Sequence, residues 1–522
     1  MGKVASSGVR LPELLGTLSL AVDLGLGQPM GHVARSCVIA RRLADRMGAP
    51  DRDREALYYV TLLGWLGCIA DSHQSAAWFG NDIDYRAGVY DRDLAPLPFL
   101  GYLLSRAGAG ASVPRRAGRV AALVATGARS AQETLHAHCQ VTTAVAQRLG
   151  IDDEACRLLD QIFARWDGKG LPKGLAGEDI GLPVRLWHVA DVAEVHHRRS
   201  GVATAVEVVR SRRGTQFDPA VVDDLCRDPT PLFDGLDTEG RWQDLTEVEP
   251  GLCLPLSEAD LDAALDAVGD WVDLKSPVFG GHSRGVAELC AAAAERAGMP
   301  LDDIRLVRRA GLVHDLGRVG VPNSIWDKTT PLDESELERV RLHSYYTERM
   351  LSRPARLAQI GAVAALAHER LDGSGYHRGL RADAMPMTAR ILAVADTYHA
   401  KQEPRPHRPA LSAAQAAAHV TRQARDGRLD PAAVDAVLAA AGQRQTLAAP
   451  RPAGLTPREV EVLALLANGL TNRQVARRLG ITPKTVGNHV ERIYTKAGVS
   501  TRAAATLFAI EHGLLPHRAS HD

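Results

Sequence analysis

Apolar residues recur at intervals of three and four positions through most of the chain, which is the spacing of helices with one buried face. The pattern is clear in residues 282–297 and 411–424, and glycine-rich loops interrupt it. The apolar stretch 11–26 contains Glu13, Asp23 and several glycines, so we interpret it as a buried helix and not as a signal peptide. The sequence therefore predicts an all-α protein.

The composition changes near the middle of the chain. Residues 228–256 are rich in Pro, Gly, Asp and Glu, as linkers are. The polar residues from Ser257 to Asp260 then predict the start of a helix over 258–273. We expect a linker and connecting helix in the region 228–275.

Two parts of the chain carry the same glycine pattern. Residues 166–191 and 371–396 both contain D-G-x-G-x-x-x-G-L and both end in Ala-Asp. At one constant offset, the Gly-His pairs at 31–32 and 281–282 coincide, and LLGWLG aligns with LVHDLG. Such self-similarity predicts two copies of one helical unit, at 12–227 and 276–445.

The two copies differ in their polar residues. In the second copy His314 and Asp315 stand where the first has Gly64 and Trp65, and His368 stands where the first has Phe163. The pairs that match are His32 with His282 and Asp191 with Asp396. We therefore expect the first copy to be catalytically silent, with a role in packing, ligand sensing or dimerisation.

Composition narrows the class of protein. The 522 residues carry equal numbers of basic and acidic side chains, so the whole chain gives no electrostatic hint of a partner. The seven cysteines form no C-x-x-C pair, which favours a reducing compartment over a disulfide framework. No apolar run reaches the roughly 18 residues that a membrane helix needs. We expect a cytoplasmic protein without a membrane segment.

His314 and Asp315 lie side by side in an apolar segment, where an uncompensated carboxylate costs several kcal/mol. The second copy holds six candidate metal ligands, each in or next to an apolar segment: His282, His314, Asp315, His343, His368 and Asp396. Imidazole and carboxylate ligands suit Mn, Fe or Zn better than Cu. Any one histidine alone is more simply a structural residue, but six in order favour a metal site. Such an ion lowers the pKa of bound water from about 15.7 toward 7.

Six motifs in this order resemble the HD-GYP domain: HSRGVAEL, LVHDLGR, VRLHSYYTERML, AHERLDGSGYHRGL, ARILAVADTYHA and RPHR. This is a branch of the HD phosphohydrolase superfamily whose characterised members cleave cyclic di-GMP. The resemblance covers about 276–442. It implies one metal at His282, His314, Asp315 and Asp396, and a second, bridged by Asp315, at His343 and His368. It also implies catalytic roles for His314, Asp315 and Arg318, and phosphate contacts for Arg318, Arg405 and Arg408. We expect one or two divalent ions, with Fe or Mn as the metal.

The chain departs from the HD-GYP pattern at three places. Ala367 and His368 leave one histidine where the family usually has two, Arg318 replaces a lysine, and His377 replaces the proline of the signature. The arginine stays charged and cannot serve as a neutral amine, but it can bind a phosphate.

The last 70 or so residues differ from the rest of the chain in net charge and in the clarity of their helix-capping patterns. Residues 451–518 carry an excess of six positive charges, which suggests a polyanionic partner. Thr456 to Glu459 and Thr471 to Gln474 have the pattern of capping boxes, and Thr482 with Pro483 predicts a third helix start. A short glycine turn joins the second and third helices, as in helix-turn-helix units.

The segment LTPREVEVLALLANGLTNRQVARRLGITPKTVGNHVERIYTKAGVSTRAAA closely resembles the LuxR-type helix-turn-helix of bacterial transcription regulators. We expect this domain at 451–518, with Val475, Leu479, Val486, Val490 and Ile493 in its core. The faces left exposed predict DNA contacts by Lys484, Thr485, Asn488, His489, Arg492 and Lys496. Gly487, where the family often has lysine, and the acidic Glu491 are departures.

The leading hypothesis is a bacterial transcription regulator with a metal-binding HD-GYP-like region. That region senses or hydrolyses a phosphate-containing ligand of the cyclic dinucleotide kind, and we expect a homodimer on DNA. We lean toward an enzyme, a metal-dependent phosphohydrolase or phosphodiesterase. One alternative is a cyclic di-GMP phosphodiesterase with an accessory DNA-binding domain. Another is a regulator whose HD copies are only structural.

Overall fold

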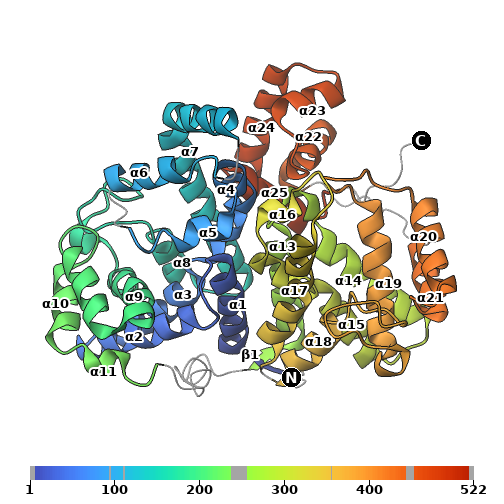
Figure 1. Cartoon of the computed structure of the whole chain (residues 1–522), viewed down its shortest axis with the longest axis horizontal. Coiled ribbons are helices and arrows are strands. Elements are labelled where there is room, and N and C mark those ends of the chain that lie inside the picture. Colours follow the sequence, from blue (N-terminus) through green and yellow to red (C-terminus); the bar gives the residue numbers. More distant parts are fainter. Residues whose placement is uncertain are drawn as a thin grey trace. The chain divides into compact units, whose positions relative to one another are not determined.

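The computed structural model describes residues 6–92, 96–109, 112–236, 255–353, 355–442 and 452–515. It divides into two compact units, Met1–Glu258 and Ala259–Asp522. Figure 1 colours them from blue to green and from yellow to red. Much of the expected linker, residues 237–254, lies outside the described residues. The expected all-α fold is confirmed, because helices make up nearly all the regular structure of the described residues.

The first unit is helical, and three of its helices pack on one another. Its helices are α1 (Leu11–Gly25), α2 (His32–Arg46), α3 (Asp51–Leu63), α4 (Ser72–Phe79), α5 (Asp82–Ala87), α6 (Pro96–Arg106), α7 (Val113–Arg148), α8 (Asp153–Leu159), α9 (Leu182–Ser211), α10 (Pro219–Arg227) and α11 (Thr230–Phe233). Helices α2, α3 and α9 are the three that pack on one another. Strand β1 (Ser6–Arg10) pairs antiparallel with β2 (Pro255–Ser257). The predicted buried helix at 11–26 is confirmed as α1.

The second unit has the same helical character. Its helices before the C-terminal domain are α13 (Glu258–Asp273), α14 (His282–Arg296), α15 (Leu301–Val313), α16 (Asn323–Trp326), α17 (Glu334–Leu351), α18 (Ala355–Ala364), α19 (Met387–Gln402), α20 (Ala413–Arg425) and α21 (Pro431–Ala441). Helix α14 packs on α15, α19 and α21. The helix predicted at 258–273 is confirmed as α13.

Corresponding helices of the two units begin in the same way. Gly31 and Gly281 have φ of 94° and 79°, a left-handed conformation that glycine adopts without strain. Each glycine places a histidine at the first position of a helix, where its ring is fully buried. An aspartate of the preceding helix, Asp23 or Asp273, accepts hydrogen bonds from the first turn. The two units therefore share a local design around one buried histidine.

The C-terminal domain contains α22 (Pro457–Ala467), α23 (Asn472–Leu479), α24 (Pro483–Ala497) and α25 (Arg502–Glu511). The capping boxes predicted at Thr456 and Thr471 are confirmed, and Thr482 caps α24. Gly480, in the left-handed conformation, ends α23 and makes the turn into α24. The predicted core is confirmed, because Val475, Val486 and Ile493 are buried and Leu479 and Val490 pack against them.

None of the described helices combines the length and apolarity needed to cross a membrane.

Candidate metal centre

Six side chains predicted as metal ligands converge in the second unit. His282 begins α14, and His314 with Asp315 ends α15. His343 lies on α17 and Asp396 on α19. His368 follows α18, and 13% of its side chain is exposed, whereas the other five are buried. The structure thus brings together residues that are spread over more than a hundred positions of sequence.

One group of metal-ligand atoms surrounds Oδ2 of Asp315. Its Oδ2 lies 2.9 Å from Nε2 of His314 and 3.3 Å from Nε2 of His282. Oδ1 of Asp396 completes the group, at 3.4 Å from His282 and 3.7 Å from His314. Two imidazoles and two carboxylates at these separations form a donor set for one divalent cation.

A second group of donors surrounds the other oxygen of Asp315. Oδ1 lies 3.3 Å from Nε2 of His343 and 3.8 Å from Nε2 of His368. These three residues form a further cluster of close donors. Asp315 therefore faces one group with each carboxylate oxygen, as a bridging ligand does. Because Ala367 precedes His368 where the family usually has a second histidine, this group has three protein ligands and the first has four.

Hydrogen bonds on the far side of the rings orient the histidines. Nδ1 of His314 donates to the carbonyl of Gly311 at 2.9 Å, and Nδ1 of His343 donates to the carbonyl of Val340. These bonds place a proton on Nδ1 and turn Nε2 toward the cluster. Such bonds to the outer nitrogen are typical of metal-binding histidines.

Several buried polar atoms of the cluster have no hydrogen-bond partner among the described residues. They are Nε2 of His314, His343 and His368, both carboxylate oxygens of Asp315, and Oδ1 of Asp396. A buried polar atom without a partner costs about 1–3 kcal/mol, so a group of them calls for compensation. Nitrogen and oxygen donors that point toward one another fit a divalent metal, which the HD resemblance implies.

The charge states of Asp315 and His368 at neutral pH suit a cation, whereas His314 holds a proton. Burial would raise the pKa of Asp315, but the charges of Arg318 and His314 hold it well below the usual range. Burial lowers the pKa of His368 to about 4, against the pull of Asp396. His368 is therefore neutral and Asp315 ionised at pH 7, which are the forms that bind a metal. Burial lowers the pKa of His314, but the charge of Asp315 raises it to about 9, so a metal ion would have to displace a proton from this imidazole.

Two arginines lie beside the cluster. Nη2 of Arg318 forms an ion pair with Asp315 and is 3.5 Å from Nε2 of His282. The guanidinium groups of Arg318 and Arg405 lie over the ring of Phe279, at 4.1 and 4.7 Å from its centre. Planar guanidinium groups in such a place suit the oxygens of a phosphate.

Arg408 does not join them. Its guanidinium donates to four backbone carbonyls, those of Ala400, Lys401, Glu403 and Pro409. These bonds tie down the loop after α19. Arg408 therefore fixes this loop, and its expected phosphate contact stays a prediction.

Two residues that shape the site, Glu369 and Tyr376, were not predicted from the sequence. Glu369 is buried, and its carboxylate accepts hydrogen bonds from the backbone of Arg378, Gly379 and Leu380, which holds the glycine-rich loop. The ring of Tyr376 stacks on His368, with centroids 5.0 Å apart. An acidic residue directly after His368 was a signal for the first, whereas nothing in the spacing indicated the stacking.

The corresponding place in the first unit is filled by aromatic side chains. Nε2 of His32 lies 3.1 Å from Asp191, and Trp65 donates to the other oxygen of Asp191 at 3.1 Å. The Trp65 ring contacts those of His138 and Phe163. Among the described residues, each cluster of three or more close metal donors lies in the second unit.

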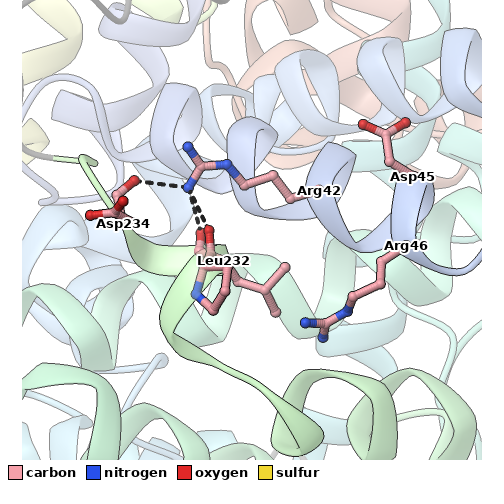
Figure 2. Close-up of a pocket in the computed structure, with 6 residues that line it drawn as sticks. Arg42, Asp45, Arg46, Leu232 and Asp234 are labelled. Atoms are coloured by element: carbon pink, nitrogen blue, oxygen red, sulfur yellow. Dashed lines mark hydrogen bonds between the residues drawn. The ribbon is translucent and has the colours of Figure 1, made fainter.

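A surface pocket of about 530 Å³ in the first unit is lined by Arg42, Arg46 and neighbouring residues. Figure 2 shows that Arg42 donates to backbone carbonyls next to it, those of Pro231, Leu232 and Asp234. Arg46 pairs with Asp224 at 2.6 Å. Both cations of this pocket are therefore already engaged.

The predicted DNA-contacting side chains lie on α24 but are not equivalent. Lys484, Asn488 and Arg492 are exposed, whereas Thr485 and His489 are half-buried. Lys496 is exposed in part, but its Nζ lies 2.7 Å from Glu459 on α22. The structure therefore assigns Lys496 to an ion pair within the domain.

Comparisons with known proteins agree with this geometry. The HD-domain family matches residues 266–433, which contain the six donors. The luxR family of bacterial regulatory proteins matches residues 453–509. The chain carries an HD domain and a LuxR-family domain.

Relatives of the HD domain are phosphodiesterases. The chain is 29% identical to the 3'3'-cGAMP-specific phosphodiesterase 3 of Vibrio cholerae, over 78% of this chain and 90% of the relative. It is 36% identical to the cyclic di-GMP phosphodiesterase response regulator RpfG of Xanthomonas campestris, over 31% of this chain and 43% of that protein. A crystal structure of a cyclic GMP-AMP-specific phosphodiesterase from Vibrio cholerae matches with a TM-score of 0.58 and 27% identity, covering 84% of this chain and 98% of that one.

Proposed function

We propose that the HD domain is a metal-dependent phosphodiesterase for 3',3'-linked cyclic dinucleotides and that it regulates the LuxR-type domain of the same chain. The observation that carries the proposal is Asp315, whose two oxygens face two separate groups of histidines. Bridging carboxylates of this kind serve paired metal ions that act on phosphate esters. The names of the relatives support cyclic dinucleotides as the substrate class.

The residues around the donors have distinct tasks in this proposal. The donor cluster holds one or two divalent ions, Fe or Mn, which supply Lewis acidity and a nucleophile from water at neutral pH. Arg318 and Arg405 stabilise the negative charge that develops on the phosphoryl oxygens. His314 and Asp315 would hold the ion and are the catalytic residues of this proposal.

The first unit is, in this proposal, a degenerate copy of the HD domain at about 12–227. The helix starts at His32 and His282 support a common origin, as does the hydrogen bond of Trp65 to Asp191. An indole has no lone pair for a metal, and its ring fills the space between the helices. We therefore assign this copy a role in packing, ligand sensing or dimerisation.

The LuxR-type domain binds DNA with α24 in the major groove. Lys484 and Arg492 contact phosphates or base edges, and Asn488 lies on the same exposed part of the helix. Thr485 and His489, which are half-buried, have smaller contributions. Binding as a homodimer on two half-sites remains our prediction for the assembly.

The test combines hydrolysis with DNA binding in the full-length protein. Manganese-loaded wild type should cleave cyclic di-GMP or 3',3'-cGAMP, and Asp315→Asn should not. DNA footprints should change when a non-hydrolysable cyclic dinucleotide is added. Hydrolysis without any effect on DNA would favour an enzyme with an accessory DNA-binding domain. The absence of both metal and hydrolysis would favour a structural role of the HD copies.

A further inference from the structure

Behind His282, on the side away from Asp315, lies a second buried polar group. Nδ1 of His282 is 3.1 Å from both carboxylate oxygens of Glu403, which directly follows α19. Nδ1 of His399, one turn earlier, is 3.1 Å from Oε1 of the same carboxylate. The guanidinium of Arg405 lies 2.7 Å from Oε2. Nitrogen atoms of His282, His399 and Arg405 therefore lie within 3.1 Å of the Glu403 carboxylate.

We propose that Glu403, braced by His399, is a positioning residue that fixes the proton of His282 on Nδ1 and so presents Nε2 to the metal. The inference rests on the metal site of the proposed function. His314 and His343 have backbone carbonyls for this purpose. His282 is the first residue of its helix, so no preceding turn supplies a carbonyl at that place, and a side chain has to do so.

In the first unit a glutamate also contacts the outer nitrogen of the buried histidine, but from another position. Nδ1 of His32 lies 2.5 Å from Glu194, which stands three residues after Asp191. Arg35 contacts the same carboxylate at 2.5 Å. Glu403 stands seven residues after Asp396, so the carboxylate has moved by about one helical turn. In both units a glutamate from the aspartate-bearing segment holds the outer nitrogen of the buried histidine.

His399 occupies the position that Glu194 has in the first unit, and Gly285 occupies that of Arg35. A Cβ at Gly285 would lie 2.1 Å from Nε2 of His399. The absent side chain at this interior position of α14 therefore makes room for the imidazole. Glycine inside a helix costs about 1 kcal/mol relative to alanine, so its presence here indicates a packing requirement.

The three residues His282, His399 and Glu403 are also close enough to bind a cation of their own. Two contacts argue against this. Arg405 already neutralises the Glu403 carboxylate. Nε2 of His282 faces Asp315 and Asp396, so a second ion on Nδ1 would require an imidazole bridging two metals. A carboxylate–histidine pair that orients a metal ligand is the simpler reading.

The experiment measures Mn²⁺ binding to the chelator-treated full-length protein, in competition with a coloured chelator. Loss of an outer-sphere partner weakens metal affinity by about 10–100-fold, which we expect for Glu403→Ala at unchanged stoichiometry. Glu403→Gln should recover part of the affinity, because its amide oxygen can still accept the Nδ1 proton. Gly285→Ala should also weaken binding, although alanine favours the helix.

The matched control is Glu348→Gln, because Glu348 accepts from His377 and Arg378 and touches none of the donors. It should leave the affinity unchanged. Equal affinities for wild type and Glu403→Ala would overturn the positioning role while leaving the proposed function intact. The loss of one metal equivalent in Glu403→Ala would overturn it as well, because Glu403 would then be a ligand. Wild type that takes up no Mn²⁺ would defeat the proposed function together with this inference.

Discussion

Replacing Asp315 by asparagine tests the central feature of the HD domain. Asparagine keeps the shape of the side chain but has a single oxygen, so it cannot face both histidine groups as a ligand. Loss of an outer-sphere partner alone costs 10–100-fold in metal affinity, and we expect the loss of a bridging ligand to exceed about 100-fold. The substitution therefore separates metal binding from packing at this position.

The magnitude follows from the linkage between binding and unfolding. At a Mn²⁺ concentration of about 100 times Kd, the wild type is stabilised by about 2.7 kcal/mol, whereas a variant bound 100-fold more weakly gains only about 0.4 kcal/mol. For a unit of 150–250 residues, 1 kcal/mol shifts Tm by about 2–4 °C. The wild type should thus gain roughly 5–11 °C from Mn²⁺, and Asp315→Asn no more than about 2 °C.

The assay is thermal unfolding of chelator-treated protein, followed with and without Mn²⁺ by circular dichroism. Asp302→Asn provides the control, because this exposed aspartate lies in the first turn of α15, far along that helix from the cluster. It should keep the full metal-induced shift. An equal shift in the Asp315 variant and the wild type would refute the reasoning that Asp315 is a ligand.

Three further predictions concern the other domains. Arg492→Ala should weaken DNA binding and reduce the slope of log affinity against log salt concentration by about one phosphate contact. Lys496→Ala should leave that slope unchanged, because Lys496 is paired with Glu459. Equal slopes for the two variants would contradict the assignment. Burial would raise the pKa of Glu459, but Lys496 and Thr456 lower it to about 2 from its ordinary 4.5. This carboxylate therefore stabilises the folded LuxR-type domain above pH 4.5, and its contribution is lost as the pH falls toward 2. Glu459→Gln should remove that dependence in melting curves at pH 5 and 3, and an unaltered acid profile would argue against it. His32→Gln should destabilise the first unit by about 3–5 kcal/mol, because buried carboxylates lose their partner. Elemental analysis of this variant should find the same amount of metal per chain as in the wild type. A loss of metal would show that the first unit binds it.

The donor cluster could be predicted from the sequence because its signals are local. His314 and Asp315 are adjacent charged residues in an apolar run, and each other donor sits next to a recognisable helix segment. The repeat added a comparison, since Trp65 at the position of Asp315 indicated which residues are chemical and which are structural. Helix starts were predictable for the same reason, as Thr456 and Glu459 show.

The direction of side chains from loops could not be predicted in this way. Arg405 and Arg408 belong to one short motif, yet one lies over Phe279 and the other is bound by carbonyls. Which neighbours a loop side chain meets depends on segments distant in sequence, here α14 and the end of α19. The role of Glu403 could not be predicted either, because its partner His282 lies more than a hundred residues earlier in the sequence.

The two units differ in how the polar groups buried between their helices are accommodated. Both bury a histidine and an aspartate where helices meet, and each buried group without a partner costs about 1–3 kcal/mol. The first unit lacks most of these polar atoms, and Trp65 donates a hydrogen bond to one oxygen of Asp191. The second keeps six buried ligand atoms that have no hydrogen-bond partner among the described residues. A bound cation would compensate these atoms, so we expect metal binding and stability to be coupled in the second unit and not in the first.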